Sequence, residues 1–208
     1  MRRNFSVTVL GLLLSMLGTW PIMEIGAAEP SLPGHYQLLD EPSRHEPGKV
    51  ILFEFADFYC PHCHMFETRV VPLLKQEFGE QLEVRLVGFP VIPNKPSTAF
   101  EMYEQAKLMG KGQEMKRILF RTIHEHHIPF FDKSIRAILI KAVGLDVHAF
   151  EEGLKNGQAF QAFQEGIRWG ERIGVSHTPT IVLDGNILVD QPDVNNLKTI
   201  IRGILARQ

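Results

Sequence analysis

The feature that most constrains the fold is an almost continuously apolar segment, which runs up to the only two cysteines of the chain. Residues 49–58 read KVILFEFADF, and a run so rich in Val, Ile and Phe predicts a strand buried on both faces, as in parallel or mixed sheets. After the cysteines, HMFETRVVPLLKQEF places apolar residues three and four apart, which predicts a helix. We therefore expect Cys60 and Cys63 at a junction between a buried strand and a helix.

The CPHC sequence at this junction predicts a redox-active dithiol. Pro61 suits the first helical position, because its missing N–H would have no partner there, and it leaves Cys60 as the N-cap. Free N–H groups and peptide dipoles at a helix N-terminus favour a thiolate over a thiol, and His62 can add a positive charge or a donor beside the sulfur. A stabilised thiolate makes the disulfide form an oxidant. We assign Cys60 as the reachable nucleophile and Cys63, further into the helix, as the resolving cysteine.

Two other interpretations of these residues stay open. Cys60 to His64 also spells CxxCH, the attachment motif of c-type haem, and two thiols with two imidazoles can hold zinc. The haem motif normally lies in a helical setting, however, and His62 and His64 are too close in sequence to the cysteines to close a tetrahedron easily. Further histidines at 124–127 can add ligands only if the fold brings them near. We expect no metal, and no cofactor beyond the Cys60–Cys63 disulfide itself.

The N-terminus has the pattern of a secretory signal peptide. A Met-Arg-Arg start is followed by an apolar run that ends in small residues, so we expect residues 1–28 to be removed after Ala28 and the protein to be exported. The alternative is an uncleaved anchor, since the run is near the roughly 20 residues that span a bilayer. An oxidising compartment suits a chain that works through a disulfide.

Charge and cysteine spacing narrow the function further. The formal net charge is −2 without a basic stripe, so we expect no nucleic-acid partner. No second long apolar run follows the first, so we expect a soluble mature chain. A disulfide that closes a loop of only two intervening residues stabilises a fold weakly, because its effect on the unfolded chain grows with loop size. The cysteine pair therefore indicates chemistry more than structure.

A second motif lies far downstream, in GVSHTPTIVLDG at residues 174–185. It combines a glycine-led approach, Thr178-Pro179, a β-branched strand and an Asp-Gly turn. Together with the strand–CPHC–helix junction it resembles the thioredoxin superfamily, in which a cis-proline loop faces the CxxC motif. The resemblance implies a cis bond before Pro179, a Thr178 backbone free to pair with a bound peptide, and a substrate contact for His177.

Within that superfamily the chain is similar to the DsbA group of periplasmic disulfide oxidases. FxCPHC after an apolar strand is the signature of that group, and the likeness covers residues 34–206. Most residues between Leu86 and Thr178 show helical periodicity. The resemblance therefore implies an α/β protein: a thioredoxin fold with an inserted all-helical subdomain.

Periodicity and the resemblance together divide the chain into five parts. The predicted parts are a signal peptide at 1–28, an extended lead-in at 29–48, the first half of the thioredoxin domain at 49–96, a helical insertion at 97–157 and the second half of the thioredoxin domain at 158–208. A strand hairpin is expected around an Asp-Gly turn near residue 184, and a last helix near the C-terminus.

The resemblance also implies a function. It predicts a periplasmic thiol:disulfide oxidase that donates its Cys60–Cys63 disulfide to reduced exported proteins and is reoxidised by a membrane-bound partner. Glu54, which interrupts the apolar strand, matches the buried acid that helps to move the proton of Cys63; otherwise it is a strand-end carboxylate that reaches solvent. We expect a monomer.

One residue departs from the pattern of the best-known oxidases. They carry an aliphatic residue before the cis proline, whereas related isomerases often carry Thr, as this chain does at Thr178. An isomerase or a reductase of the same fold is therefore the alternative function. The lead-in is too short for the dimerisation domain that such isomerases use.

Smaller expectations concern residues near the dithiol. We expect Asp57 to be a capping or solvated group, His64 to point into solvent, and the histidines at 124–127 to form a solvated helix end. Pro72 lacks an N–H for the carbonyl of Thr68, which predicts a kink inside the first helix.

Overall fold

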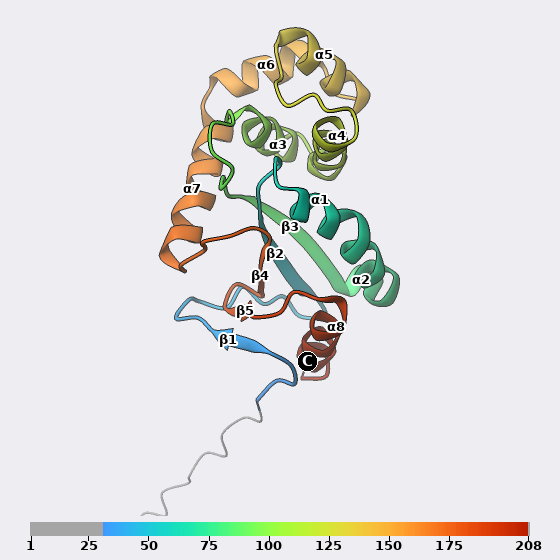
Figure 1. Ribbon diagram of the computed structural model, residues 1–208, viewed down its shortest axis with the longest axis vertical. Helices are drawn as coiled ribbons and strands as arrows, with labels where there is room; N and C mark the ends of the chain where they lie inside the picture. The colour runs from blue at the N-terminus through green and yellow to red at the C-terminus, as the bar shows by residue number, and fades with distance from the viewer. Residues whose placement is uncertain (1–30, 208) are drawn as a thin grey trace, which may run out of the picture. The chain divides into compact units, whose positions relative to one another are not determined.

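A mixed five-stranded sheet is the centre of the computed structural model of the chain, which describes residues 31–207 (Figure 1). The predicted signal peptide, residues 1–28, lies outside the described residues. The strand order is β1-β5-β4-β2-β3, and β2 and β3 are the parallel pair among these strands. The strands are β1 Tyr36–Leu38, β2 Val50–Ala56, β3 Leu82–Gly88, β4 Thr180–Leu183 and β5 Ile187–Val189.

The helices of the described part fall into three groups along the chain. The segment after the cysteines consists of α1 Pro61–Met65, the π-helical η1 Phe66–Val70, α2 Val71–Phe78 and the short η2 Gly79–Gln81. The helices between β3 and the return to the sheet are α3 Thr98–Leu108, α4 Gly112–His124, α5 Lys133–Ala142 and α6 Val147–Lys155. The last group is α7 Gln158–Arg172 and α8 Val194–Leu205.

β2 is buried along its whole length, as its apolar sequence predicted. Side chains alternate between the two faces of a strand. Ile51 and Phe55 point into an apolar cluster with Trp169 of α7, whereas Leu52 points into a cluster built from α2 and α8. Helices therefore cover both faces of the sheet, and Glu54 lies on the face that carries Leu52.

The helix after the cysteines changes its geometry in the middle. Pro72 cannot donate to the carbonyl of Thr68, so the regular hydrogen-bond ladder is interrupted there. The N–H of Val71 instead bonds the carbonyl of Phe66, five residues earlier, within the π-helical turn η1. The kink predicted at Pro72 thus takes the form of a π-helical segment between α1 and α2.

The four helices α3–α6 do not have a core separate from the dithiol. Phe58 and Cys63 belong to the same buried cluster as Phe100, Phe120 and Phe150 of these helices. The rings of Phe58 and Phe120 lie 4.9 Å apart between centroids. Figure 1 shows the four helices at the end of the sheet where α1 begins. The inserted helices therefore form one wall of the cysteine junction.

The segment before β2 contributes more than extended chain. Residues 36–38 of the lead-in form edge strand β1, which pairs antiparallel with β5; the sequence analysis did not predict it. The expected hairpin is present: Leu183 pairs with Ile187, and Asp184 and Gly185 in the connection between them both have positive φ (45° and 82°).

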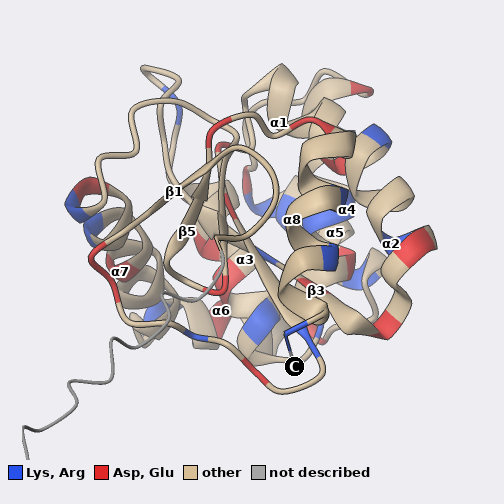
Figure 2. Ribbon diagram, turned by 90° about the horizontal axis from the view of Figure 1, so that it is seen from below, with Lys and Arg blue, Asp and Glu red and all other residues tan. Residues whose placement is uncertain are grey.

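The distribution of charged residues and the apolar length of the helices are both unexceptional in residues 31–207. In the view of Figure 2, basic and acidic residues are interspersed on neighbouring elements. Among residues 31–207, no helix combines the length and the apolar character that crossing a membrane requires.

Candidate active site

The two cysteines lie at the first turn of α1, as the sequence predicted. Cys60 is the N-cap residue and Pro61 follows it as the first helical residue. Both cysteines are free thiols. Cys60 keeps 4% of its surface exposed and Cys63 none. Pro61 and His62 are exposed beside Cys60, so Cys60 is the sulfur nearer to solvent.

The loop that contains Pro179 lies against the dithiol. The Thr178–Pro179 bond is cis, as expected, and the Cys60 thiol donates to the Thr178 carbonyl over 3.5 Å. His177 is exposed on this loop. A pocket of about 260 Å³ lies beside the loop and is lined by His177 and Pro179 among other residues. The fold thus brings together two motifs that are far apart in the sequence.

Cys63 is held as a protonated thiol by its surroundings. Burial is the main cause that raises its pKa, and the charge of Glu54 raises it further. The Thr178 hydroxyl opposes this shift, although it makes no hydrogen bond of ordinary geometry to any described residue. Ionisation of Cys63 therefore needs a nearby group that can take its proton.

Glu54 is completely buried, which answers the question that its sequence position left open. Neither carboxyl oxygen has a hydrogen-bond partner among the described residues. Burial raises the pKa of Glu54 to about 8, against the opposing effect of Lys116. A carboxyl group in this state can accept or donate a proton near neutral pH.

Asp57 is neither solvated nor a helix cap, contrary to the sequence expectation. Its side chain is fully buried. One oxygen accepts the N–H of Tyr59 at 2.9 Å, and the other accepts the N–H groups of Val91 and Ile92 at 2.8 Å each. Asp57 therefore ties the segment before the dithiol to the loop after β3.

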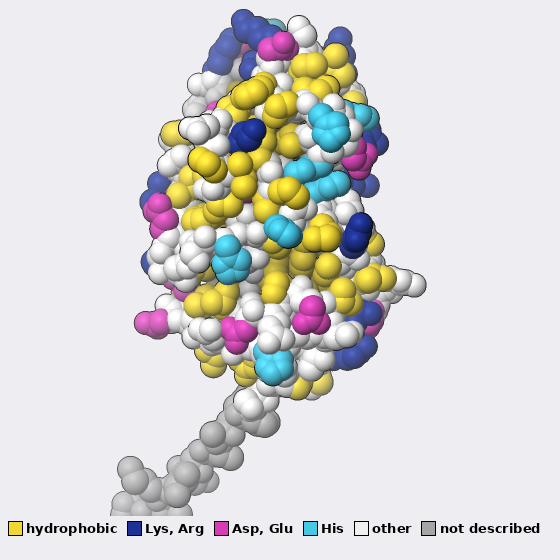
Figure 3. Space-filling view, viewed as in Figure 1, with side chains coloured by type: hydrophobic (Ala, Val, Ile, Leu, Met, Phe, Trp, Pro, Cys, Tyr) yellow, Lys and Arg dark blue, Asp and Glu magenta, His cyan; other side chains and the backbone are white. Residues whose placement is uncertain are grey.

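His64 and His124 also correct an expectation. His64 does not point freely into solvent, because its ring stacks on His124 with 4.8 Å between centroids and 4° between planes. His124 is half-buried rather than part of a solvated helix end, and its Nε2–H donates to the Phe58 carbonyl at 2.9 Å. Burial lowers the pKa of His124. On the face of the molecule drawn in Figure 3, histidines are grouped among hydrophobic side chains.

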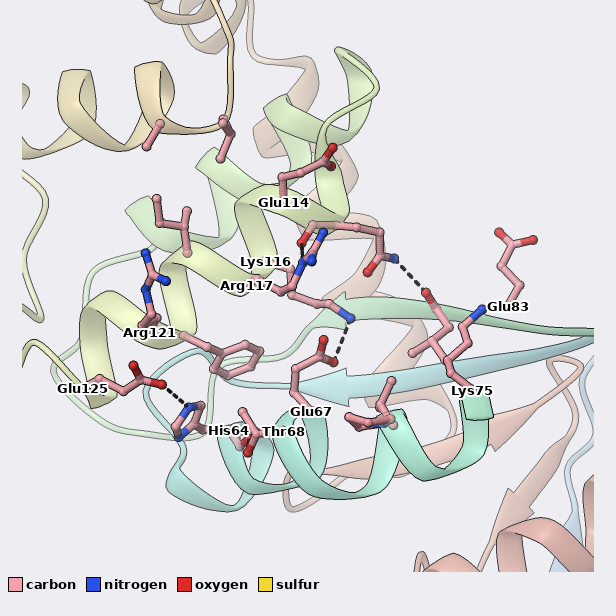
Figure 4. Close-up of a pocket in the computed structure, with 18 residues that line it drawn as sticks. His64, Glu67, Thr68, Lys75, Glu83, Glu114, Lys116, Arg117, Arg121 and Glu125 are labelled. Carbon is pink, nitrogen blue, oxygen red and sulfur yellow. Dashed lines mark hydrogen bonds and ion pairs between the residues drawn. The ribbon is translucent and has the colours of Figure 1, made fainter. Parts of the chain in front are cut away.

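A groove of about 1090 Å³ runs between the α1–α2 segment and α4 (Figure 4). At its wall, Lys116 of α4 forms an ion pair with Glu67 of η1, with 2.8 Å between Nζ and Oε2. The sequence analysis missed both residues. The signal was available for Lys116, which lies three residues before Leu119 and four before Phe120, on the buried side of α4.

Metal ligands were the other open question. Residues 31–207 contain no group of three or more His, Cys, Asp or Glu side chains arranged to hold a metal ion.

Comparison with known proteins agrees with this geometry. A family model described as thioredoxin matches residues 45–202. The chain belongs to the thioredoxin family. It is 26% identical over 160 residues to the probable disulfide bond formation protein D of Bacillus anthracis, covering 73% of this chain and 71% of that protein. It is 23% identical over 192 residues to DsbA of Pseudomonas aeruginosa, covering 90% and 87%.

Solved structures show the same fold. The crystal structure of DsbA from Xylella fastidiosa has a TM-score of 0.67 at 20% identity, covering 86% of this chain and 97% of that one. A Proteus mirabilis DsbA variant with a non-covalently bound peptide has a TM-score of 0.65 at 15% identity, covering 86% and 98%. The predicted resemblance to DsbA, and the predicted thioredoxin fold with inserted helices, are therefore confirmed.

Proposed function

We propose that this chain is a thiol:disulfide oxidoreductase that acts as an oxidase, donating its Cys60–Cys63 disulfide to reduced exported proteins. The observation that carries the proposal is the asymmetry of the dithiol. Cys60 is the N-cap of a helix and keeps 4% of its surface exposed next to the exposed Pro61 and His62, whereas Cys63 is completely buried and feels the charge of Glu54. Such a pair offers an incoming thiolate one sulfur to attack and keeps the other as an internal leaving group.

The transfer takes two exchange steps. A substrate thiolate attacks Sγ of Cys60 in the disulfide, the bond to Cys63 breaks, and the electron pair leaves with the Cys63 sulfur. That sulfur takes a proton, for which Glu54 is the buried donor. A second substrate thiolate then attacks the substrate sulfur of the mixed disulfide and releases Cys60 as a thiolate. Two electrons have passed from the substrate to the protein, and the substrate holds the new disulfide.

The loop before β4 is the proposed place where substrate binds. Its Thr178 carbonyl accepts a hydrogen bond from the Cys60 thiol, and an extended peptide that takes the place of this contact can pair with the backbone of the loop. His177 and Pro179 line the pocket beside it. The peptide held by the Proteus mirabilis DsbA variant supports a peptide substrate.

The cellular setting follows from the same proposal. Relatives named DsbA and the predicted signal peptide at residues 1–28 favour a periplasmic protein, and we propose that it works as a monomer. An oxidase that has become reduced needs a partner that removes two electrons, and we assign this task to a membrane-bound reoxidising protein. No cofactor beyond the disulfide takes part.

Thr178 favours a second candidate, an isomerase or reductase of the same fold. Its buried hydroxyl lowers the pKa of Cys63, and a tuned inner thiol suits enzymes that release substrates by attack from that sulfur. Equilibration of the purified protein with defined ratios of reduced and oxidised glutathione separates the candidates. A potential near about −120 mV supports the oxidase, whereas one near about −180 mV, typical of protein disulfide isomerase, supports the isomerase and one near about −270 mV, typical of thioredoxin, supports the reductase.

A further inference from the structure

An exposed basic side chain lies beside two aromatic rings at the edge of the dithiol site. Nζ of Lys95 is 5.5 Å from the centroid of the Tyr59 ring and 5.9 Å from that of the Phe130 ring. Both distances fall within the roughly 6 Å over which a ring attracts a cation. Tyr59 directly precedes Cys60, and Phe130 belongs to the connection between α4 and α5. The cation is therefore held by rings from two separate segments, one of which carries the nucleophile.

The loop that carries Lys95 is fixed to the cysteine segment. The Tyr59 hydroxyl donates to the carbonyl of Pro96, the residue after Lys95, over 3.4 Å. Asp57 accepts the N–H of Tyr59 and, through its other oxygen, two N–H groups at residues 91–92 of the same loop. These bonds hold the backbone of the loop at a set position relative to the nucleophile, so the charge belongs to the site.

Phe130 is exposed where its neighbour in the sequence is buried. Its side chain is 61% exposed, against 5% for Phe131. Among the Phe, Tyr and Trp side chains of residues 31–207 it is the most exposed. Burying such a ring would stabilise the fold, so folding alone does not explain its exposure. The ring instead offers apolar surface next to the ammonium group, which a bound chain can cover.

The positive charge of Lys95 has no carboxylate partner in the part of the chain that the structure describes, where its contacts are the two rings. Asp57 is an acid of the same region, but both of its oxygens accept backbone N–H groups. A carboxylate on a bound chain would therefore meet a cation that is free to pair. Rings on the same side exclude water from that pair, which strengthens the attraction between the charges.

A substrate joined to Cys60 brings its own neighbouring residues to this part of the surface. In the mixed disulfide the substrate cysteine is bonded to Sγ of Cys60, and three residues of extended chain reach at most about 10 Å from it. Lys95 lies against the ring of the residue that precedes Cys60. Side chains close to the substrate cysteine can therefore reach the ammonium group.

We propose that Lys95, held by the rings of Tyr59 and Phe130, is a specificity-determining residue for the disulfide exchange: it favours protein substrates that carry Asp or Glu within three residues of the reacting cysteine. The proposal rests on the proposed function, because it describes the substrates of that same site. The ammonium group pairs with the substrate carboxylate, and the Phe130 ring covers the apolar part of the substrate next to it.

Kinetics with charged peptides test the proposal. Oxidised protein is mixed with reduced two-cysteine peptides that differ in one residue, which is Glu, Gln or Lys at each position within three residues of the first cysteine. At the best position, kcat/KM for the Glu peptide should exceed that for the Gln peptide by about two- to fivefold, as expected for an exposed ion pair. The Lys peptide should be slower than the Gln peptide. Raising the salt concentration should reduce both differences.

Two substitutions at Lys95 and one at Phe130 make the test specific. Lys95→Met removes the charge but keeps an unbranched side chain, and the Glu and Gln peptides should then be oxidised equally fast. Lys95→Glu should invert the preference, so that the Lys peptide becomes the fastest of the three. Phe130→Leu should weaken the preference for Glu without inverting it. Because each ratio compares two peptides on the same variant, any change in the reactivity of the dithiol cancels.

Lys155 provides the matched control. It is exposed on α6, and its ammonium group pairs with Glu152, with 2.6 Å between Nζ and Oε1. Lys155→Met should therefore keep the wild-type ratios. The inference is overturned if Glu gives no advantage at any position of the peptide, or if the advantage survives Lys95→Met.

Failure of the proposed function gives a different result. If the protein reduces peptides and does not oxidise them, the same peptides in their disulfide form report the charge preference. A preference for Glu in that direction would remove the oxidase and leave the inference. Oxidation of the peptides without any charge preference would do the reverse.

Discussion

Replacing Glu54 with Gln should make the folded protein increasingly stable relative to the wild type as the pH rises. At low pH the carboxyl group is protonated in both the folded and the unfolded chain, so burial has no electrostatic cost. As the pH passes the ordinary value of a glutamate, the unfolded chain releases this proton while the folded chain keeps it. Stability of the wild type therefore falls with rising pH until the folded carboxyl also ionises.

The size of this effect follows from the separation of the two pKa values. The pKa of Glu54 is about 8 in the folded protein, against about 4.3 for an unperturbed glutamate. Each unit of difference between the two pKa values corresponds to about 1.4 kcal/mol of unfolding free energy. The full loss of stability is therefore roughly 5 kcal/mol once the pH is well above 8. Between pH 5 and pH 8 the stability advantage of the Glu54→Gln variant over the wild type should therefore grow by about 3.5 kcal/mol.

Urea denaturation of the oxidised wild type and Glu54→Gln at several pH values between 5 and 8 measures this difference. The buried amide of Gln has its own cost, but that cost does not vary with pH, so only the slope matters. Glu165→Gln, at an exposed position of α7, is the matched control and should show no slope. A difference between Glu54→Gln and wild type that stays flat over this range would refute the argument that Glu54 is protonated by burial.

Four further predictions concern the dithiol. Cys60→Ser should abolish disulfide transfer to a reduced peptide, whereas Cys63→Ser should accumulate a mixed disulfide through Cys60, identified by mass spectrometry; trapping through Cys63 would reverse the assignment. His62→Ala should make the couple more reducing by tens of mV, where about 30 mV equals 1.4 kcal/mol, and an unchanged glutathione equilibrium would contradict it. At pH 7 the reduced protein should withstand more urea than the oxidised one; equal midpoints would argue against an oxidase. Purified protein should carry neither haem nor zinc, and a Soret band or stoichiometric zinc would disprove this.

The parts of the fold that depend on local pattern could be predicted from the sequence. The continuous apolar run predicted β2, and Asp184-Gly185 predicted the hairpin, because each element follows from backbone and burial preferences within a few residues. The placement of Pro179 near Cys60 is a long-range contact, but it was reachable because both motifs resemble one family. Edge strand β1 was missed, since its three residues are mostly exposed and show no alternation.

The contacts that surround the dithiol could not be predicted in the same way. Asp57 looked like a solvated group because nothing in the sequence shows that the loop after β3 turns back to supply Val91 and Ile92. His64 looked exposed because its partner His124 lies on α4, and the path of α4 over α1 depends on the packing of the whole insertion. The surroundings of these residues are set by tertiary packing, which the local periodicity of the sequence does not reveal.

The pairing of β2 with β4 has a consequence for the newly made chain. β2 ends at Ala56 and its partner β4 begins only at Thr180, with all the inserted helices between them. Contacts between segments so distant in sequence form late, because a long loop must close before they can contribute. A chain emerging from synthesis or export exposes Cys60 and Cys63 well before Thr178 and Pro179 are available to cover them. During that interval its two cysteines are an unprotected dithiol that any disulfide can oxidise. The newly made protein is then itself a substrate for thiol:disulfide exchange.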